Sequence, residues 1–334
     1  MKSFELARPT SLDEAIDLLP KGRGPAEIDD ARPLAGGQDI LTEMKDYLIT
    51  PKRLVDLAGV AGLDAYQSAP DLVLGSLTRL ARIAADPQIA LHHRALSIAA
   101  ESVASVQIRN QATLGGNLCQ RPRCWYYRNE SVPCIKKGGA ECFAESGLNK
   151  YNAIFGGGPS YIVHPSDCAT ALVLLDATVT KRGPRGESRM PLEQFFTLPS
   201  EGSVVRENVL KANEILVQVE VPAPKPGWTS TYLKFKERES FDFAMSAVAL
   251  SARIEGDTIA EARMVLGAVA PIPWRAGEAE SFLAGKPNTH ATWKEAAEIA
   301  LAQAEPLEHN GYKVPLTKGL IQKALRELSG GESK

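Results

Sequence analysis

The sequence predicts an α+β fold in two domains, and three observations support this. The chain has 334 residues, more than one compact core usually holds, so two domains are expected. The segment A-P-K-P-G at residues 223–227 has the composition of a linker and divides the chain into residues 1–225 and 226–334. Beyond this linker, strand patterns come first and helical patterns follow, which is typical of an α+β layer rather than of alternating βαβ units.

The first domain opens with a helix signal. Ser11 and Glu14 form a capping-box pair in front of apolar positions. Hydrophobic periodicity and turn residues then predict the elements that follow. We expect strands at residues 32–35, 53–57 and 72–75, a helix over 40–48 that begins near Asp39, and helices over 77–84 and 92–105.

The pattern continues through the rest of the chain. Residues 170–180 read as a helix followed by a strand, and residues 215–222 alternate apolar and polar side chains with the period of a strand. The second domain is then predicted to hold strands at 231–235, 247–255 and 259–266, and helices at 276–283, 293–303 and 318–328.

Composition excludes several classes of function. The formal net charge of −2 gives no electrostatic reason to expect nucleic acid or an anionic membrane as a partner. No apolar run approaches the roughly 20 residues that span a bilayer. The first residues show neither an apolar signal core nor a twin arginine, so the cytoplasm is the expected location.

Two Gly-Gly segments, at residues 35–39 and 113–117, are candidates for phosphate binding. Glycine lets the backbone approach closely enough for its N–H groups to bond phosphate oxygens. Either segment alone is more often a plain turn. The sequence has no G-x-G-x-x-G that opens a helix and no P-loop motif, so a nucleotide site here would be neither Rossmann nor P-loop.

Four of the five cysteines fall within 24 positions, with the spacing C-x4-C-x9-C-x7-C. Thiolates are soft ligands for zinc or iron–sulfur clusters. Structural zinc favours paired C-x2-C knuckles, and these longer gaps fit a cluster held by a loop better. Zinc, or thiols with no ligand, remain the alternatives. Nearby cations would offset the charge of a cluster: Arg121, Arg123, Lys136 and Lys137.

Other polar residues give weaker signals. The five histidines lack the spacing of a catalytic metal site, and no hydrolase triad signature occurs. Ser166 and Asp167 could hydrogen-bond a ligand, or they could cap the helix that follows them. The cations Lys234, Lys236 and Arg238 fit the solvated face of a strand when they are considered alone.

Taken in order, the segments resemble the FAD-binding subunit, or medium chain, of the xanthine dehydrogenase family of molybdenum hydroxylases. No single motif is specific, but together they follow the family's order along nearly the whole chain. The matching stretches are F-x-x-x-R-P-x-S-L-x-E-A at 4–15, A-G-G-x-x-I-L at 35–41, L-V-D-L at 54–57, I-R-N-x-A-T-x-G-G-N at 108–117, H-P-S-D at 164–167, E-I-L at 214–216 and Y-x-K-F-x-x-R-x-S-x-D-F-A at 232–244.

This resemblance implies a two-lobed FAD-binding domain of the vanillyl-alcohol-oxidase type, followed by a small α+β domain of the CO dehydrogenase flavoprotein type. It also implies roles for matching residues. The first loop would wrap the FAD pyrophosphate, the second would lie at the phosphate and flavin, Asp167 would bond the adenosine part, Leu216 would line the adenine pocket, and the Lys234 cation would stabilise reduced flavin. The implied set is Ala35, Gly36, Gly37, Gln38, Asp39, Ile40, Leu41, Asn110, Thr113, Gly115, Gly116, Asn117, Ser166, Asp167, Leu216 and Lys234.

The cysteine segment, about residues 118–160, resembles the extra loop of the 4-hydroxybenzoyl-CoA reductase β subunit and of bacterial aldehyde oxidoreductase FAD subunits, where it carries a 4Fe–4S cluster. Cys124, Cys134 and Cys142 match three of that family's ligands. The family's fourth ligand position is Ser160 here, and Cys119 is a candidate replacement. Ser160 as an oxygen ligand, a three-iron cluster and no cluster all stay open. Cys168 is expected to be a packed thiol.

The resemblance therefore implies an FAD-dependent oxidoreductase subunit that relays electrons through its flavin to an external acceptor, with no catalytic side chain of its own. The implied partners are a large subunit with the molybdenum cofactor and a small subunit with two 2Fe–2S clusters, in a heterotrimer or a dimer of heterotrimers. Two alternatives remain, a stand-alone flavin oxidoreductase and a non-catalytic metal-binding assembly module. The sequence reveals neither the substrate nor the final electron acceptor.

Overall fold

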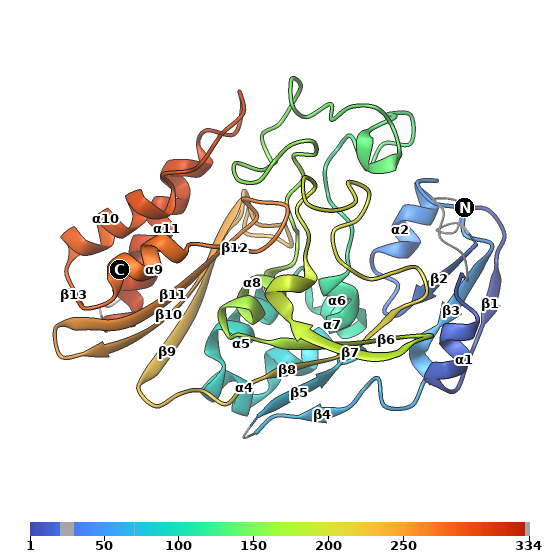
Figure 1. Cartoon of the computed structure of the whole chain (residues 1–334), viewed down its shortest axis with the longest axis horizontal. Helices are drawn as coiled ribbons and strands as arrows, with labels where there is room; N and C mark the ends of the chain where they lie inside the picture. The colour runs from blue at the N-terminus through green and yellow to red at the C-terminus, as the bar shows by residue number, and fades with distance from the viewer. Residues whose placement is uncertain (21–29, 70, 331–334) are drawn as a thin grey trace.

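The computed structural model describes residues 1–20, 30–69 and 71–330. Three regions lie in a row: an N-terminal lobe, a central lobe and a C-terminal domain, with long loops rising above their junction (Figure 1). Each region has its own sheet and hydrophobic core. The α+β class and the two-lobed architecture predicted for the first half are confirmed. No helix of the described residues is long and apolar enough to cross a membrane.

The N-terminal lobe is a small parallel sheet with strand β3 at its centre. The predicted capping signal is confirmed, since the Ser11 hydroxyl accepts the backbone N–H of Glu14 at 3.2 Å, while the Glu14 carboxylate accepts that of Thr10 at 2.9 Å. The cap sets the first helix against the sheet, where Ala15 and Ile16 are buried. The elements are β1 (Glu5–Ala7), α1 (Leu12–Asp17), β2 (Ala31–Leu34), α2 (Ile40–Lys45) and β3 (Arg53–Asp56).

The central lobe is an antiparallel sheet in the order β4-β5-β8-β6-β7, covered by short helices. Its core is continuous from the sheet to the helices, and Leu96, Leu172 and Val219 are fully buried in it. The strands are β4 (Tyr66–Gln67), β5 (Leu72–Gly75), β6 (Thr178–Gly183), β7 (Gly186–Pro191) and β8 (Ile215–Val221); the helices are α3 (Leu80–Ala85), α4 (Pro87–His92), α5 (Arg94–Ser102), α6 (Val106–Gln111), α7 (Leu114–Leu118) and α8 (Asp167–Leu174).

The C-terminal domain is an antiparallel sheet that lies between two helical layers. Helices α9–α11 cover one face, and helices α5 and α8 of the central lobe contact the other (Figure 1). Strand β10 is therefore buried over most of its length. The elements are β9 (Trp228–Phe235), β10 (Ser246–Glu255), β11 (Thr258–Gly267), β12 (Trp274–Arg275), α9 (Gly277–Leu283), β13 (Lys286–Pro287), α10 (His290–Ala300) and α11 (Lys313–Leu328).

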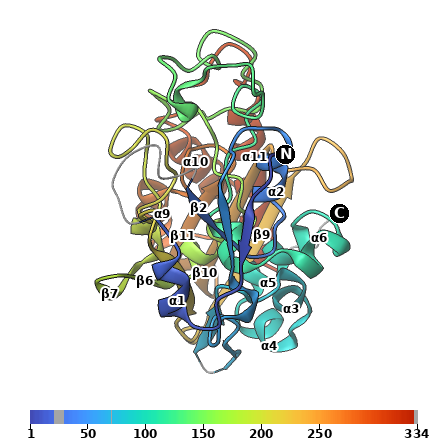
Figure 2. The same cartoon turned by 90° about the vertical axis from the view of Figure 1, so that its right-hand side faces the viewer.

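The cysteine-bearing segment between α7 and α8 is built mostly of loops, with one 3-10 turn at Ile135–Lys137 (Figure 2). Its far end is fastened to the C-terminal domain. The Asn310 amide donates to the backbone carbonyls of Asn152 and Ala153 at 3.2 and 3.1 Å, and the Lys313 ammonium donates to the carbonyls of Tyr151 and Ala268 at 3.1 and 2.7 Å. Backbone groups of the segment therefore depend on side chains from another domain.

Several helices differ from the prediction. The second Gly-Gly segment, expected to be a turn, lies in helix α7, because the Thr113 side chain caps it by accepting the Gly116 N–H at 3.2 Å. Helix α2 ends at Lys45, three residues earlier than expected. The long helix predicted over 92–105 is the shorter α5 (Arg94–Ser102). Such short elements carry too few periodic positions for the sequence pattern to mark them.

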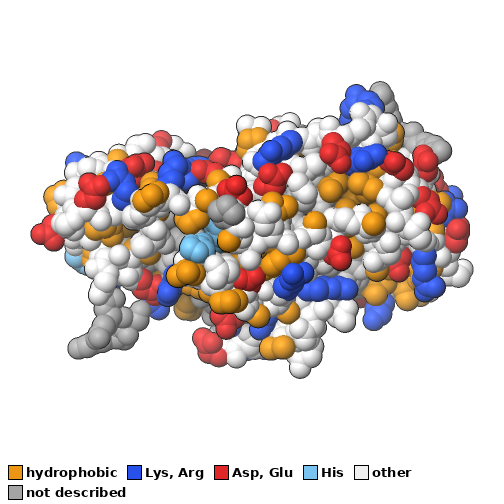
Figure 3. Space-filling model, turned by 90° about the horizontal axis from the view of Figure 1, so that it is seen from below, with side chains coloured by type: hydrophobic (Ala, Val, Ile, Leu, Met, Phe, Trp, Pro, Cys, Tyr) orange, Lys and Arg blue, Asp and Glu red, His pale blue; other side chains and the backbone are white. Residues whose placement is uncertain are grey.

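Over the described part of the face seen from below, acidic and basic side chains are interspersed among apolar ones (Figure 3).

Candidate functional site

A pocket of about 640 Å³ lies between the N-terminal lobe, the central lobe and the cysteine segment. Both Gly-Gly segments line it, together with strand β8 and the end of strand β9. Of the predicted cofactor residues, those at the pocket wall are Ala35, Gly36, Gly37, Gln38, Asp39, Ile40, Thr113, Gly115, Gly116, Asn117, Asp167, Leu216 and Lys234. Segments far apart in the sequence thus meet around one cavity.

The first glycine segment presents unpaired backbone donors. Within the described residues, the N–H groups of Gly36, Gly37, Gln38 and Asp39 have no hydrogen-bond acceptor. Gly37 has a φ of +74°, the left-handed conformation that glycine adopts without steric cost. Successive N–H groups that converge in this way form an anion-binding concavity.

Each glycine segment packs closely against neighbouring backbone, the first against Gln111 and Ala112 and the second against Ser76. A Cβ atom added to Gly36 would lie 2.2 Å from the carbonyl oxygen of Gln111, which is too close for any side chain. Gly115 is equally confined, since a Cβ there would lie 2.8 Å from the Cβ of Ser76. Glycine is therefore required at both positions for packing, and these contacts set the width of the pocket.

The second segment is less available to a ligand than the first. The Gly115 N–H donates to the Ser76 carbonyl at 2.8 Å, and the Gly116 N–H is used by the cap of Thr113. Asn117 is buried, and its side-chain oxygen accepts the hydroxyl of Ser166. This segment therefore shapes the wall of the pocket, whereas the first one offers free donors.

Three predicted residues do not line the pocket. Leu41 packs beneath the first loop, with its Cδ1 3.1 Å from where a Gly37 Cβ would be. Asn110 lies on α6. Ser166 caps α8 by accepting the Ala169 N–H at 2.9 Å, which was one of the two roles considered for it.

Asp167 and Lys234 meet at the pocket and neutralise each other. The Lys234 Nζ lies 2.8 Å from Asp167 Oδ2, and the Tyr232 hydroxyl donates to Asp167 Oδ1 at 2.6 Å. Lys234 also donates to the Ser102 carbonyl at 3.1 Å. The sequence interpretation gave both residues separate tasks toward a cofactor. In the structure each is already the other's partner, so the pair presents little net charge.

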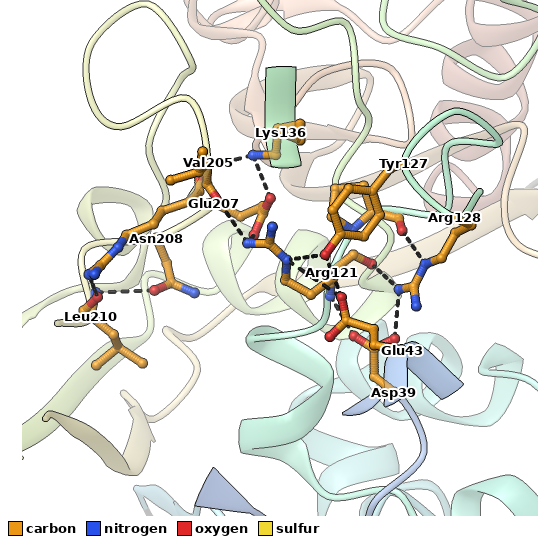
Figure 4. Close-up of polar contacts among 12 residues, drawn as sticks. Asp39, Glu43, Arg121, Tyr127, Arg128, Lys136, Val205, Glu207, Asn208 and Leu210 are labelled. Carbon is orange, nitrogen blue, oxygen red and sulfur yellow. Dashed lines mark hydrogen bonds and ion pairs between the residues drawn. The ribbon is translucent and has the colours of Figure 1, made fainter. Parts of the chain in front are cut away.

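A buried ionic network joins the pocket wall to the cysteine segment (Figure 4). At its centre Arg121 donates to Glu207 Oε2 at 2.6 Å and to the Tyr127 hydroxyl at 2.9 Å, and Tyr127 donates to Glu43. Lys136 lies 2.5 Å from the other oxygen of Glu207. Burial opposes the charge of Arg121, but Glu207, Tyr127 and Glu43 hold its pKa above the ordinary value.

The first loop is part of the same network through Asp39. Its carboxylate accepts the backbone N–H of Arg121 at 2.7 Å and the guanidinium of Arg128 at 2.7 Å, and it pairs with Arg123 at 2.8 Å. Helix α2 begins directly after Asp39, as predicted, but the Asp39 side chain makes no cap bond there. Its charge faces the cysteine segment instead.

This network changes the role expected of the cations near the cysteines. Arg121, Arg123 and Lys136 were predicted to offset the charge of a cluster, yet each is paired with a carboxylate. Burial lowers the pKa of Lys137, while the thiolate charges of Cys134 and Cys124 act to raise it. Lys136 also interacts with the charge of Cys134, but its stronger partner is Glu207. Sequence reasoning missed Glu43, Tyr127, Arg128 and Glu207, whose partners lie far away in the chain.

The structure does not gather the four predicted metal ligands into one group. Cys119 ends helix α7 at the wall of the large pocket, where burial and then Glu207 raise the pKa of its thiol to about 12. Cys124 borders a separate hollow of about 40 Å³. Burial raises the pKa of Cys134 and of Cys142, and the charge of Cys124 adds to both increases. Cys124 therefore lies near the other two.

Within the described residues, no three His, Cys, Asp or Glu side chains are placed to hold a metal ion. Two donors nevertheless point at the thiols: the backbone N–H of Tyr161 lies 3.5 Å from Cys142 Sγ, and the Asn152 amide lies 3.7 Å from Cys124 Sγ. Cys168 is fully buried in the core of α8, and burial raises its pKa, as expected of a packed thiol.

The pocket has the features of a dinucleotide cofactor site, with free backbone donors at one wall, an apolar lining and a neutralised ion pair. Comparison with known proteins gives the same class. Residues 2–224 match the family described as the FAD binding domain in molybdopterin dehydrogenase, and residues 230–328 match the CO dehydrogenase flavoprotein C-terminal domain. The chain therefore belongs to the FAD-binding medium subunits of the molybdenum hydroxylase family, and it is a subunit of an FAD-dependent oxidoreductase.

Individual relatives cover nearly the whole chain. The aldehyde oxidoreductase FAD-binding subunit of Escherichia coli (strain K12) is 34% identical over 98% of both chains. Among solved structures, carbon monoxide dehydrogenase from Hydrogenophaga pseudoflava matches with a TM-score of 0.76 and 26% identity over 98% of both chains. Quinoline 2-oxidoreductase from Pseudomonas putida 86 matches with a TM-score of 0.74 and 27% identity over 99% of both chains.

Proposed function

We propose that this chain binds FAD in the large pocket and relays electrons between iron–sulfur clusters and an external acceptor. The observation that carries the proposal is the row of unpaired N–H groups from Gly36 to Asp39, which faces a pocket of dinucleotide size. Such a row suits the pyrophosphate of FAD. When bound, FAD supplies both one-electron and two-electron transfer.

In this proposal the chain's own residues bind FAD and shape its pocket, and none of them reacts chemically. Gly36 keeps the first loop close to the Gln111 backbone, Gly115 keeps the second segment close to Ser76, and Leu216 supplies an apolar surface for the adenine ring. We assign the Asp167–Lys234 pair to orientation: its carboxylate and ammonium can each still bond a ligand hydroxyl or carbonyl, while the pair as a whole adds little charge. No nucleophile or general base is required.

We infer that the chain functions within a larger enzyme. Relatives are called FAD-binding subunits or medium chains, such as the carbon monoxide dehydrogenase medium chain of Hydrogenophaga pseudoflava, which is 26% identical. The proposed partners are a large subunit that carries the molybdenum cofactor and a small subunit that carries 2Fe–2S clusters. The five free thiols suit the reducing cytoplasm, which is the proposed location.

We further propose that the cysteine segment holds a 4Fe–4S cluster. The charge of Cys124 acts on both Cys134 and Cys142, and Asn152 and Tyr161 aim N–H donors at the sulfurs of Cys124 and Cys142. Hydrogen bonds to ligand sulfurs are a common means of tuning such clusters. Because the thiols are not yet gathered around a metal position, cluster binding would complete the loop's final geometry.

The test is to purify the complex anaerobically through a tag on this chain and to measure flavin, iron and molybdenum. The expected result is one FAD per copy of this chain, with molybdenum and iron-bearing subunits retained. A complex purified without flavin would contradict the flavin assignment. Turnover of a small substrate by the isolated chain, without partners, would favour the stand-alone alternative.

A further inference from the structure

We propose that Arg109 is a positioning residue for the bound flavin, because it holds a strained turn at the wall of the pocket. This inference rests on the FAD site proposed above. The turn covers residues 102–105, between helices α5 and α6, and its central residues Val103 and Ala104 both line the pocket. Arg109 lies on helix α6 and does not itself line the pocket.

The strain in the turn lies at Ala104. Its φ is +44°, in the left-handed region that residues with a Cβ rarely adopt. Val103 before it has a φ of −71° and a ψ of 120°, so the two residues follow the φ values at the centre of a type II turn. Glycine or asparagine is usual at the second of these places. Such strain persists only where surrounding groups hold it, and it is concentrated at ligand sites.

Two cations hold the turn through three successive carbonyl groups. Nη1 of Arg109 donates to the carbonyl of Val103 at 2.8 Å and to that of Ala104 at 3.3 Å. The Lys234 ammonium donates to the carbonyl of Ser102 at 3.1 Å. Lys234 is neutralised by its carboxylate partner, whereas no carboxylate of the described residues pairs with Arg109. Arg109 therefore places an uncompensated positive charge against the turn.

The peptide bond between Val103 and Ala104 then directs a free donor toward the pocket. This bond is trans, and in a trans peptide the carbonyl and the N–H point in opposite directions. The Val103 carbonyl points at Arg109, behind the wall, so the Ala104 N–H points the other way. Among the described residues that N–H has no acceptor. A charge bonded to the carbonyl also polarises the peptide, which makes its N–H a stronger donor.

The position of the turn along the pocket fits the flavin ring. Helix α6, with six residues, separates the turn from the Gln111 carbonyl against which Gly36 packs, and a helix of this length spans about 9 Å. The ribityl chain of FAD covers a comparable distance between pyrophosphate and ring. The polar edge of the ring carries several acceptors, which become more negative on reduction. The Ala104 N–H therefore bonds that edge.

The experiment compares the flavin-free full chain with three variants. Arg109→Gln removes the charge that holds the turn, and Arg109→Lys keeps a cation. Arg79→Gln is the matched control, because Arg79 donates to the Gln111 carbonyl at the other end of α6 and does not line the pocket. FAD and ADP are titrated separately, and the reduction potential of bound FAD is measured anaerobically. Hydrogen exchange at residues 103–106 of wild type is followed with FAD and with ADP.

We expect Arg109→Gln to weaken FAD binding by about tenfold, because a held donor is lost, and to leave ADP binding nearly unchanged. The same substitution should lower the reduction potential, since the reduced ring loses a stabilising donor. Arg109→Lys should restore part of both losses, and Arg79→Gln should keep the wild-type potential. In wild type, FAD but not ADP should slow exchange of the Ala104 N–H, a result that does not depend on any variant folding.

Three results overturn the assignment while the FAD site stands. Equal losses of FAD and ADP affinity with an unchanged potential would place the turn at the adenine half of FAD. Wild-type affinity and potential in a folded Arg109→Gln chain would remove Arg109 from the site. Equal protection of the Ala104 N–H by FAD and ADP, or protection by neither, would show that it does not bond the flavin ring. A wild-type chain that binds neither FAD nor ADP refutes the FAD proposal itself.

Discussion

The flavin pocket and the cysteine segment lie side by side but are built in different ways. The pocket wall depends on backbone contacts, such as the approach of Gly36 to the Gln111 carbonyl. The cysteine segment has little regular structure, and charged side chains hold it in place: Arg121 and Lys136 on Glu207, and Arg128 on Asp39. Backbone packing fixes a cavity before any ligand arrives. Side-chain charges hold the cysteine segment in place, and the cluster proposed above would then arrange its thiols.

The largest expected effect tests the charged half of this comparison. Glu207→Gln keeps the volume of the side chain but leaves Arg121 and Lys136, which are mostly buried, without their carboxylate. Breaking a buried pair costs about 3–5 kcal/mol. Denaturant unfolding should show a loss of this size, and hydrogen exchange should quicken in residues 121–137 more than in helix α7.

The matched control for this change is Glu5→Gln. Glu5 pairs with Arg53 at the surface, where its side chain is 58% exposed. An exposed pair of this kind contributes about 0–1 kcal/mol. Equal effects of the two substitutions on unfolding would show that the network does not hold the segment.

The second-largest expected effect tests the role of backbone contacts in the pocket wall. Gly36→Ala places a Cβ 2.2 Å from the Gln111 carbonyl oxygen, so the first loop must move away from the end of helix α6. Overpacking of this kind costs about 1–3 kcal/mol. We expect at least a tenfold loss of FAD affinity, measured by titrating the flavin-free chain. Gly277→Ala is the control, because a Cβ there meets nothing within 4 Å. Similar affinities for both variants would refute the role of close approach.

Lys313 allows a test at the end of the cysteine segment. It is fully buried, its ammonium bonds only carbonyl groups among the residues that the structure describes, and burial lowers its pKa to about 7. Between pH 7 and its ordinary pKa, the unfolded chain binds the proton more tightly than the folded chain. Folding stability should therefore rise with pH in this window, by up to about 1.4 kcal/mol per unit from this residue.

Lys313→Met should remove this contribution to the slope. The comparison is of unfolding free energies for wild type and variant at several values between pH 7.5 and 9.5. The absolute stability of the variant also reflects the two carbonyls left without donors, so the difference in slope is the quantity that decides. Parallel curves for the two proteins would contradict a depressed pKa for Lys313.

The smallest expected change in folding stability lies outside both the pocket and the cysteine segment. It gives a reference against which the larger changes can be compared. Gly319 is exposed in the middle of helix α11, and a Cβ there meets nothing within 4 Å. Gly319→Ala should stabilise the chain by about 0.5–1 kcal/mol, because alanine loses less entropy in a helix. Thermal unfolding would measure this. A loss of stability would show that the surroundings of α11 are tighter than described.

The sequence predicted features that depend on neighbouring residues more accurately than features that depend on residues far apart in the chain. The cap at Ser11 and the strand at Leu72–Gly75 were predicted correctly because their signals are local. Strand β8 was likewise marked by its alternation. Helices α6 and α7 were missed because they are short and contain polar residues or glycine.

For the site, most of the residues that the sequence predicted to bind a cofactor line the pocket, but their partners were not predicted. Arg121 and Glu207 are 86 positions apart, and Lys234 and Asp167 are 67 apart. No periodic pattern connects residues at such separations, so pairing had to come from the fold. The resemblance implied that the Lys234 cation stabilises reduced flavin. Because Asp167 is its partner in the structure, we instead assign the pair to orientation.

The ionic network also bears on how this subunit could be re-engineered. Glu43 and Glu207 belong to the flavin-binding scaffold, whereas Arg121, Tyr127 and Lys136 lie in or beside the cysteine segment. A chimera that deleted the segment would leave two buried carboxylates without counterions. One that grafted the segment onto a relative without these carboxylates would bury unpaired cations. The cysteine segment therefore cannot be exchanged between subunits by itself. A transfer must include Glu43 and Glu207 as well.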